Sequence, residues 1–252
     1  MNSSDHPLDR FIADLCGRSP LEGSDIAALK ALPFRMRRVD AGTYLVREGS
    51  VPDHCAVLVE GYAFRQKVTG DGSRQILAVC VPGDAVDLQN IFLNVSDHSV
   101  QMLNKGTIAD LLREPLQELV MTRPRLARAL IQQTLFEASI LREWVVNVGQ
   151  RDARERIAHI LCEFAVRLES RGLAGKDGFE LPMTQEQLAD AAGLTSVHVN
   201  RVLKGLEKDG LINRRRRHIH YDNWRALQDA GDFTRGYLHI PGEDLVDQAF
   251  AV

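Results

Sequence analysis

Residues 184–203 read TQEQLADAAGLTSVHVNRVL, and this stretch decides the fold of the C-terminal third of the chain. Thr184 and Gln187 form a capping box, in which each side chain bonds the backbone N–H of the other residue and starts a helix. Gly193 supplies the left-handed residue that a tight turn between two helices needs. Thr195 can then cap the start of a second helix. We therefore predict a helix-turn-helix over this stretch.

The second predicted helix has one apolar and one polar face. Its apolar stripe, at helical spacing, consists of Val199, Val202, Leu203 and Leu206. On the polar face, Arg201 can pair with guanine, Asn200 with adenine, and Val197 can touch a thymine methyl group in the major groove. The candidate DNA-contacting residues are Thr184, Gln185, Thr195, Ser196, Val197, His198, Asn200, Arg201, Lys204, Arg214 and Arg216. A helical hairpin with a merely solvated polar face is the alternative, and the caps, glycine and apolar stripe disfavour it.

Basic side chains gather beside this motif. The whole chain of 252 residues has a net charge of −3, but residues 195–220 hold seven basic and two acidic side chains. Residues 210–221, GLINRRRRHIHY, are typical of a β-hairpin wing in which alternate arginines face phosphate. His218 and His220 share a strand face, but we favour packing of the wing over a metal site and expect no metal.

Residues 40–110 change to the pattern of β-strands. The short apolar runs are TYLV (43–46), AVLV (56–59), YAFR (62–65) and ILAV (76–79). Strands this short, with a turn signal every 8–12 residues, predict a sandwich or barrel. Residues 8–34 read as short helical pieces, with Asp25 expected as an N-cap.

One long helix is predicted from Pro124 to Val148, because proline suits the first turn and nothing interrupts the helix until Gly149. A heptad-like seam along it consists of Ile131, Thr134, Ala138, Leu141, Val145 and Val148. Further apolar residues lie beside the seam, and a helix that is apolar on two sides needs two partners. We favour a helix that covers the β domain on one side and meets its copy in a second subunit on the other. Burial within a monomer is the alternative.

The composition is that of an ordinary globular protein. Hydrophobic residues make up 44% and charged residues 26%, and the pI of about 6.2 excludes a protein that binds nucleic acid through bulk charge. No stretch approaches the roughly 20 apolar residues of a membrane span, and the polar N-terminus lacks a signal-peptide core. The four cysteines lie far apart, so neither a disulfide framework nor a zinc ribbon is predicted. We expect a cytoplasmic protein with reduced thiols.

These features together resemble the Crp/Fnr family of bacterial transcription regulators, most closely an alphaproteobacterial-type branch. The motifs, spread over almost the whole chain, are GSRQIL (72–77), PGD (82–84), DL (87–88), DHS (97–99), REW (142–144), RIAH (156–159), VHVNR (197–201) and YLH (237–239). The resemblance implies an α+β fold with an antiparallel, jelly-roll-like β-roll. It implies four parts: a cyclic-nucleotide-binding-like sensor domain (1–122), a dimerisation helix (123–149), a winged helix-turn-helix domain (150–225) and a C-terminal extension (226–252).

The same resemblance implies a homodimer on a palindromic operator in double-stranded DNA, with RNA polymerase as a further partner if the protein activates transcription. The recognition helix departs from the commonest family pattern, which is Arg-Glu, three intervening residues and then Arg. Ser196 and Val197 replace the first two residues while Arg201 is retained, so the operator should differ at the position that the glutamate would read.

The sensor domain departs from the family pattern as well. The candidate effector pocket consists of Gly83, Asp84, Asp87, Leu88, His98, Ser99, Leu141 and Arg142. No lysine or arginine occurs from Gln75 through Asn104, so a buried phosphate there would lack a charge partner. Leu141-Arg142 also replaces the Thr-Ser pair that contacts the purine in cyclic-AMP responders. We predict no response to cyclic AMP, no iron–sulfur cofactor because Cys16 stands alone, and an unidentified effector.

The sequence thus predicts a sequence-specific transcription regulator and not an enzyme. Control by an effector in the β-roll and effector-independent control by abundance both remain open, as do activation and repression. A cupin-like β-barrel enzyme would need a metal triad or a nucleophile elbow, and the β zone has neither. A pure ligand-binding module would not need the helix-turn-helix or the local positive charge.

Overall fold

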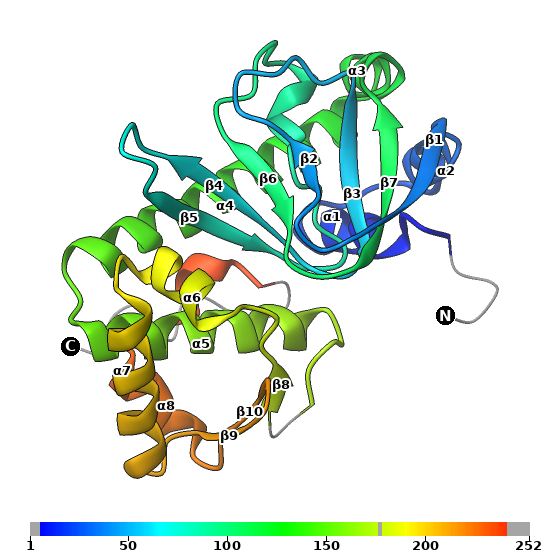
Figure 1. The fold of residues 1–252 in the computed structure, drawn as a ribbon. Helices are drawn as coiled ribbons and strands as arrows, with labels where there is room; N and C mark the ends of the chain where they lie inside the picture. Colours follow the sequence, from blue (N-terminus) through cyan, green and yellow to red (C-terminus); the bar gives the residue numbers. More distant parts are fainter. Residues whose placement is uncertain (1–5, 176–177, 241–252) are drawn as a thin grey trace. The chain divides into compact units, whose positions relative to one another are not determined.

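The computed structural model describes residues 6–175 and 178–240, and its helices and strands are drawn in Figure 1. The chain forms two compact units. The first comprises the residues up to Lys67 together with Ala78–Ala138. The second comprises Val68–Leu77 and the residues from Ser139 onward. None of the described helices is both long and apolar enough to cross a membrane.

The first unit is built around two antiparallel sheets. The strands of these sheets are β1 (Phe34–Val39), β2 (Tyr44–Val46), β3 (His54–Glu60), β4 (Ala63–Val68), β5 (Arg74–Cys80), β6 (Ser99–Met102) and β7 (Gly106–Leu112). The end of β4 and the first residues of β5 fall within the Val68–Leu77 stretch of the second unit. One sheet has the order β1-β7-β3 and the other the order β2-β6-β4-β5 (Figure 1). β7 pairs antiparallel with both β1 and β3, and β6 pairs antiparallel with both β2 and β4. The predicted antiparallel β-roll is therefore confirmed.

Three helices and one 3-10 turn complete this unit beside the start of a longer helix. They are α1 (Asp9–Arg18), α2 (Gly23–Lys30), η1 (Leu88–Ile91) and α3 (Arg113–Thr122). The cap predicted for α2 was wrong. Glu22 is the N-cap, and Asp25 is the N3 residue that completes the capping box. An acidic side chain suits either position, so the residue type alone did not separate them.

The core follows from the alternation of side chains along β3 and β7. On one face, Val57 and Leu111 belong to an apolar cluster that also contains Leu15 of α1 and Leu130 of the long helix. On the other face, alternate residues of the same strands, Leu58 and Ile108, enter the cluster between the two sheets. Because successive side chains of a strand point to opposite faces, strands that are apolar at every position require cover on both sides.

The long helix α4 (Pro124–Gly149) is confirmed. One side is buried, with Leu126, Phe136, Ile140 and Trp144 each less than a tenth exposed. On the other side the predicted seam residues Ile131, Thr134, Leu141 and Val145 are exposed, whereas Ala138 and Val148 are half-buried. Leu135 and Val146 are also exposed apolar residues of α4, and the predicted seam omitted them.

The second unit packs three helices on a central one. The central helix is α5 (Ala153–Ser170), and its contacts are with α6 (Gln185–Ala192), α7 (Ser196–Lys208) and α8 (Trp224–Ala230). A small antiparallel sheet has the order β8-β10-β9 and consists of β8 (Gly178–Glu180), β9 (Asn213–Arg215) and β10 (His218–His220). After α8 comes a 3-10 turn, η2 (Gly236–Leu238). Residues 241–252 of the predicted C-terminal extension lie outside the described part of the chain.

Candidate nucleic-acid interface

Two capped helices and a left-handed turn form the motif that the sequence predicted. The Thr184 hydroxyl accepts from Gln187 N at 3.2 Å, and the Gln187 side chain accepts from Thr184 N at 2.9 Å, which starts α6. Gly193 ends α6 with a φ of 64°. The Thr195 hydroxyl accepts from His198 N at 3.2 Å and starts α7. The helix-turn-helix is therefore confirmed.

The buried face of α7 is narrower than the sequence predicted. Val199, Leu203 and Leu206 are at most 2% exposed, whereas Val202 is half-buried and lies at the edge of the apolar stripe. Ala189 of α6 is 3% exposed where the two helices pack together. The stripe is sufficient to orient α7, so its opposite face is turned to solvent.

That solvent-facing side holds most of the candidate DNA-contacting residues. Ser196, Val197, Arg201 and Lys204 are exposed, and the exposed fraction of the Val197 side chain is 70%. His198 and Asn200 are half-buried, and Thr184, Gln185 and Thr195 are exposed near the N-termini of the two helices. The first turn of α7 contains no acidic residue, so its free N–H groups and helix dipole favour a phosphate nearby.

The wing arginines have two different environments. Arg214 donates to Glu207 of α7 at 2.6 Å, and this pairing lowers the pKa of the Glu207 carboxyl. Arg215, Arg216 and Arg217 are exposed, and the turn between β9 and β10 places Arg216 at a φ of 58°. Strand alternation predicted the same phosphate-facing role for Arg214 and Arg216. In the structure Arg216 is exposed, whereas Arg214 is paired with Glu207.

Two arginines of α5, which the sequence analysis missed, hold the motif in place. The Arg156 guanidinium donates to Ala192 O at the C-terminus of α6 at 3.1 Å and to Arg151 O at 2.8 Å. Arg154 forms a 2.7 Å ion pair with Asp209, directly after α7. Both ends of the α6–α7 pair are therefore bonded to the same helix. No local pattern could have shown these contacts, because the partners lie far apart in the sequence.

The candidate effector residues of the first unit are bonded mainly to the backbone. The carboxylates of Asp84 and Asp87 accept from Val81 N at 2.9 Å and from Ala56 N at 3.0 Å, and the Ser99 hydroxyl accepts from Glu48 N at 2.9 Å. Burial raises the pKa of Asp87 to about 6, although the Ala56 N–H opposes this. The remaining candidates are placed as follows: Gly83 at a φ of 100°, Leu88 and His98 buried, and Leu141 and Arg142 exposed on α4.

A half-buried arginine, Arg65, does lie in this region. It belongs to β4, outside the stretch from Gln75 to Asn104 in which the sequence has no lysine or arginine. Arg65 forms a 2.7 Å ion pair with Glu137 of α4. Its other two guanidinium nitrogens donate to Val86 O at 2.9 Å and Ala85 O at 3.2 Å. Each nitrogen of this guanidinium therefore already donates to an acceptor within the protein.

The cysteines and histidines form no metal site in the described part of the chain. Cys55, Cys80 and Cys162 are buried free thiols and Cys16 is half-buried. Within residues 6–175 and 178–240, no three histidine, cysteine or acidic side chains are grouped so that they could hold a metal ion. The rings of His218 and His220 pack together with centroids 4.2 Å apart.

Comparisons with known proteins agree with this arrangement. Residues 155–230 match the model of the Crp-like helix-turn-helix domain, and residues 36–123 match the cyclic nucleotide-binding domain. The chain is 31% identical over 236 residues to the transcriptional activator protein FnrL of Cereibacter sphaeroides, covering 90% of this chain and 91% of the relative. It is 29% identical to the nitrogen fixation regulation protein FixK of Bradyrhizobium diazoefficiens, covering 82% of this chain and 87% of the relative.

The fold is also similar to that of solved structures. FixK2 from Bradyrhizobium japonicum superposes with a TM-score of 0.75 at 24% identity, covering 81% of this chain and all of the other. These relatives are transcription regulators and not enzymes, which confirms that part of the sequence prediction. With a β-roll, a long helix and a capped helix-turn-helix in the family's order, the chain belongs to the Crp/Fnr family of transcription regulators.

Proposed function

We propose that the protein is a sequence-specific transcription activator that binds a palindromic operator as a homodimer. The observation that carries the proposal is the exposed face of α7, which presents Ser196, Val197, Arg201 and Lys204. The helix is capped by Thr195 at its start and held through Asp209 by Arg154 at its end. Arg201 reads guanine and Asn200 reads adenine, while Lys204 and the exposed wing arginines bind phosphate. Arg214 positions the wing through Glu207.

The proposed dimer uses the exposed side of α4. Ile131, Leu135, Leu141 and Val145 are apolar and between 43% and 68% exposed, at spacings close to those of a coiled-coil seam. A second copy of the helix would remove this apolar surface from water, which is favourable by roughly 25 cal/mol for each Å² buried. With two-fold symmetry, the two α7 helices enter successive major grooves about 34 Å apart.

Activation and the cellular setting are proposed from the relatives. FnrL is named a transcriptional activator, and we propose the same role here, with RNA polymerase as the further partner and the cytoplasm as the site of action. The four predicted parts (1–122, 123–149, 150–225 and 226–252) are proposed as the functional divisions of the chain.

Control of the activity is proposed not to involve cyclic AMP. Arg65 is a half-buried cation in this region, but Glu137 already neutralises it. Asp84 and Asp87 contribute carboxylates and no donors to the same region, so an added phosphate would meet negative charge. An unidentified effector and control by abundance remain the two candidate modes.

Selection of bound duplexes from random oligonucleotides tests the proposal. We expect an enriched palindrome whose half-sites are one helical turn apart, and a protein mass by light scattering of twice the 28.1 kDa chain. A monomer without salt-dependent DNA binding would contradict the proposed function. Calorimetry with cyclic AMP is expected to show no binding, and micromolar binding would overturn the proposed control.

A further inference from the structure

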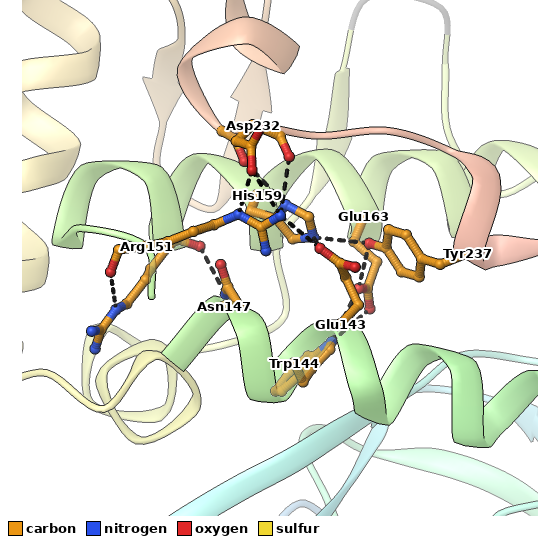
Figure 2. Close-up of polar contacts among 10 residues, drawn as sticks. Glu143, Trp144, Asn147, Arg151, His159, Glu163, Asp232 and Tyr237 are labelled. Atoms are coloured by element: carbon orange, nitrogen blue, oxygen red, sulfur yellow. Dashed lines mark hydrogen bonds and ion pairs between the residues drawn. The ribbon is translucent and has the colours of Figure 1, made fainter. Parts of the chain in front are cut away.

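A cluster of polar side chains joins three segments of the second unit, as Figure 2 shows. We call Trp144, His159, Glu163 and Tyr237 the Glu163 cluster. Trp144 at the end of α4 donates its indole N–H to both Glu163 oxygens at 3.0 Å. The Tyr237 hydroxyl, in the segment after α8, donates to Glu163 Oε2 at 2.8 Å. It also lies 3.0 Å from His159 Nε2. One carboxylate of α5 therefore holds the two other segments.

Three members of the cluster are closed to solvent, whereas Tyr237 is half-buried at its edge. His159 is 1% exposed, Glu163 3% and Trp144 6%. Burial raises the pKa of Glu163, opposed by the nearby Arg167, and burial lowers the pKa of His159 to about 4. Burying such groups costs free energy that an apolar core of the same shape would not. Hydrogen bonds depend on angle as well as distance, whereas apolar contacts do not. The polar contacts of the cluster therefore favour one arrangement of the three segments over others.

A second bridge joins the turn between α4 and α5 to α4 and to the segment after α8. Arg151, in the turn between α4 and α5, is 8% exposed. Its guanidinium donates to Glu143 of α4 at 2.6 Å and to the Asp232 carboxylate at 3.1 Å (Figure 2). It also donates to Asp232 O at 3.2 Å. The turn between the two helices is thus fixed to both α4 and the segment that follows α8.

That segment lies directly against the backbone of α5. A Cβ atom added at Gly231 would come within 2.7 Å of His159 N, so only glycine permits this approach. His159 Nδ1 donates to Gly231 O at 3.0 Å, and the rings of His159 and Tyr237 stack with centroids 5.8 Å apart. The segment is seated by close packing as well as by hydrogen bonds.

Each segment of the cluster is connected to a functional surface. The last turns of α4 carry the exposed Leu141 and Val145, which belong to the proposed dimer seam. α5 carries Arg154 and Arg156, which bond the ends of α7 and α6. A change of the angle between α4 and α5 would therefore move the recognition helix relative to the seam.

We propose that Tyr237 is a positioning residue for DNA binding: by donating to Glu163 and packing against His159 it fixes the angle between α4 and α5, and so the separation of the two recognition helices. The inference rests on the proposed homodimeric function. Tyr237 touches no DNA in this role. It acts on the binding of two half-sites at once and leaves the binding of each single half-site unaffected.

Tyr237→Phe tests this role, because it keeps the ring that stacks on His159 and removes the hydroxyl that donates to Glu163. We expect affinity for the full palindrome to fall about tenfold, the equivalent of one hydrogen bond to a charged group. Affinity for a duplex with one half-site should stay within about twofold of the wild type, since α7 itself is unchanged. Unchanged full-site binding, or an equal loss on both duplexes, would overturn the proposal.

Two further variants sharpen the experiment. Trp144→Phe removes the N–H on the α4 side of the same carboxylate and should reproduce the selective loss. Tyr44→Phe is the matched control, because its hydroxyl lies on β2 and accepts from Gln66, outside the Glu163 cluster. It should leave both affinities unchanged, and a selective loss in this control would contradict the assignment to the cluster.

A DNA-independent readout separates this inference from the proposed function. Nitroxide labels at the exposed Arg142 and Lys204, in a Cys16→Ser background diluted with unlabelled protein, report the distance between α4 and α7 within one chain. We expect one narrow distance distribution in the otherwise unaltered chain and a broadened one with Tyr237→Phe. Equal widths would overturn the inference, whereas a narrow distribution in a chain that binds no DNA would overturn only the proposed function.

Discussion

Truncation of Arg201 to alanine separates reading of the operator from folding. The side chain is exposed on α7, so its removal creates no cavity and should change the free energy of unfolding by no more than about 0.5 kcal/mol. A bidentate contact to guanine contributes about 1–3 kcal/mol to discrimination, so we expect each half-site to bind about 5- to 150-fold more weakly. The two subunits of a dimer would both contribute this loss.

The assay is fluorescence anisotropy at one fixed salt concentration, with the selected palindrome and a scrambled duplex of equal length. Arg201→Ala should weaken binding to the palindrome and leave binding to the scrambled duplex nearly unchanged. Lys204→Ala is the matched control, since loss of a phosphate contact weakens both complexes and lowers the salt slope by about 1 per subunit. Equal affinity of Arg201→Ala and wild type for the palindrome would refute the reading of guanine by this side chain.

Three further predictions concern the sensor, the dimer and the wing. Burial raises the pKa of Asp87 from 3.8 to about 6. Between these pH values the folded state holds a proton on Asp87 that the unfolded state has lost, so the free energy of unfolding falls as the pH rises. Asp87→Asn should therefore add up to about 3 kcal/mol at pH 8 and little below pH 4, measured by urea denaturation. Val145→Glu places a charge in the proposed seam and should give a monomer of unchanged helix content in sedimentation, whereas a persistent dimer would contradict this interface. Arg214→Ala should lower the free energy of unfolding by about 1 kcal/mol and leave the salt dependence of DNA binding unchanged. Arg216→Gly should reduce that salt dependence and leave the free energy of unfolding unchanged. The reverse pattern would contradict the different environments of the two wing arginines.

The features that sequence reasoning predicted well are local. The capping box of Thr184 and Gln187, the left-handed Gly193 and the cap at Thr195 each depend on residues within four positions of one another. Their hydrogen bonds form in any chain that adopts the two helices, so residue type and spacing suffice to predict them. The Asp25 cap failed for a related reason, because two positions of the same capping box favour the same kind of side chain.

The contacts that escaped sequence reasoning join distant segments. Arg65 and Glu137 are 72 residues apart, and Tyr237 and Glu163 are 74 apart. Their pairing is decided by how the strands and helices pack, and no periodicity in the sequence encodes it. Arg214 is an intermediate case. Strand alternation predicted that it faces DNA, but in the structure it forms an ion pair with Glu207 of α7.

The central claim is that two copies of α7 enter successive major grooves of one duplex. Methylation interference at guanine N7, on the selected operator with the full chain, tests it most directly because N7 faces the major groove. We predict two clusters of interfering guanines on one face of the DNA, with centres about 34 Å apart, and the loss of one guanine from each cluster with Arg201→Ala. A single cluster, or interference that Arg201→Ala leaves unchanged, would contradict the claim.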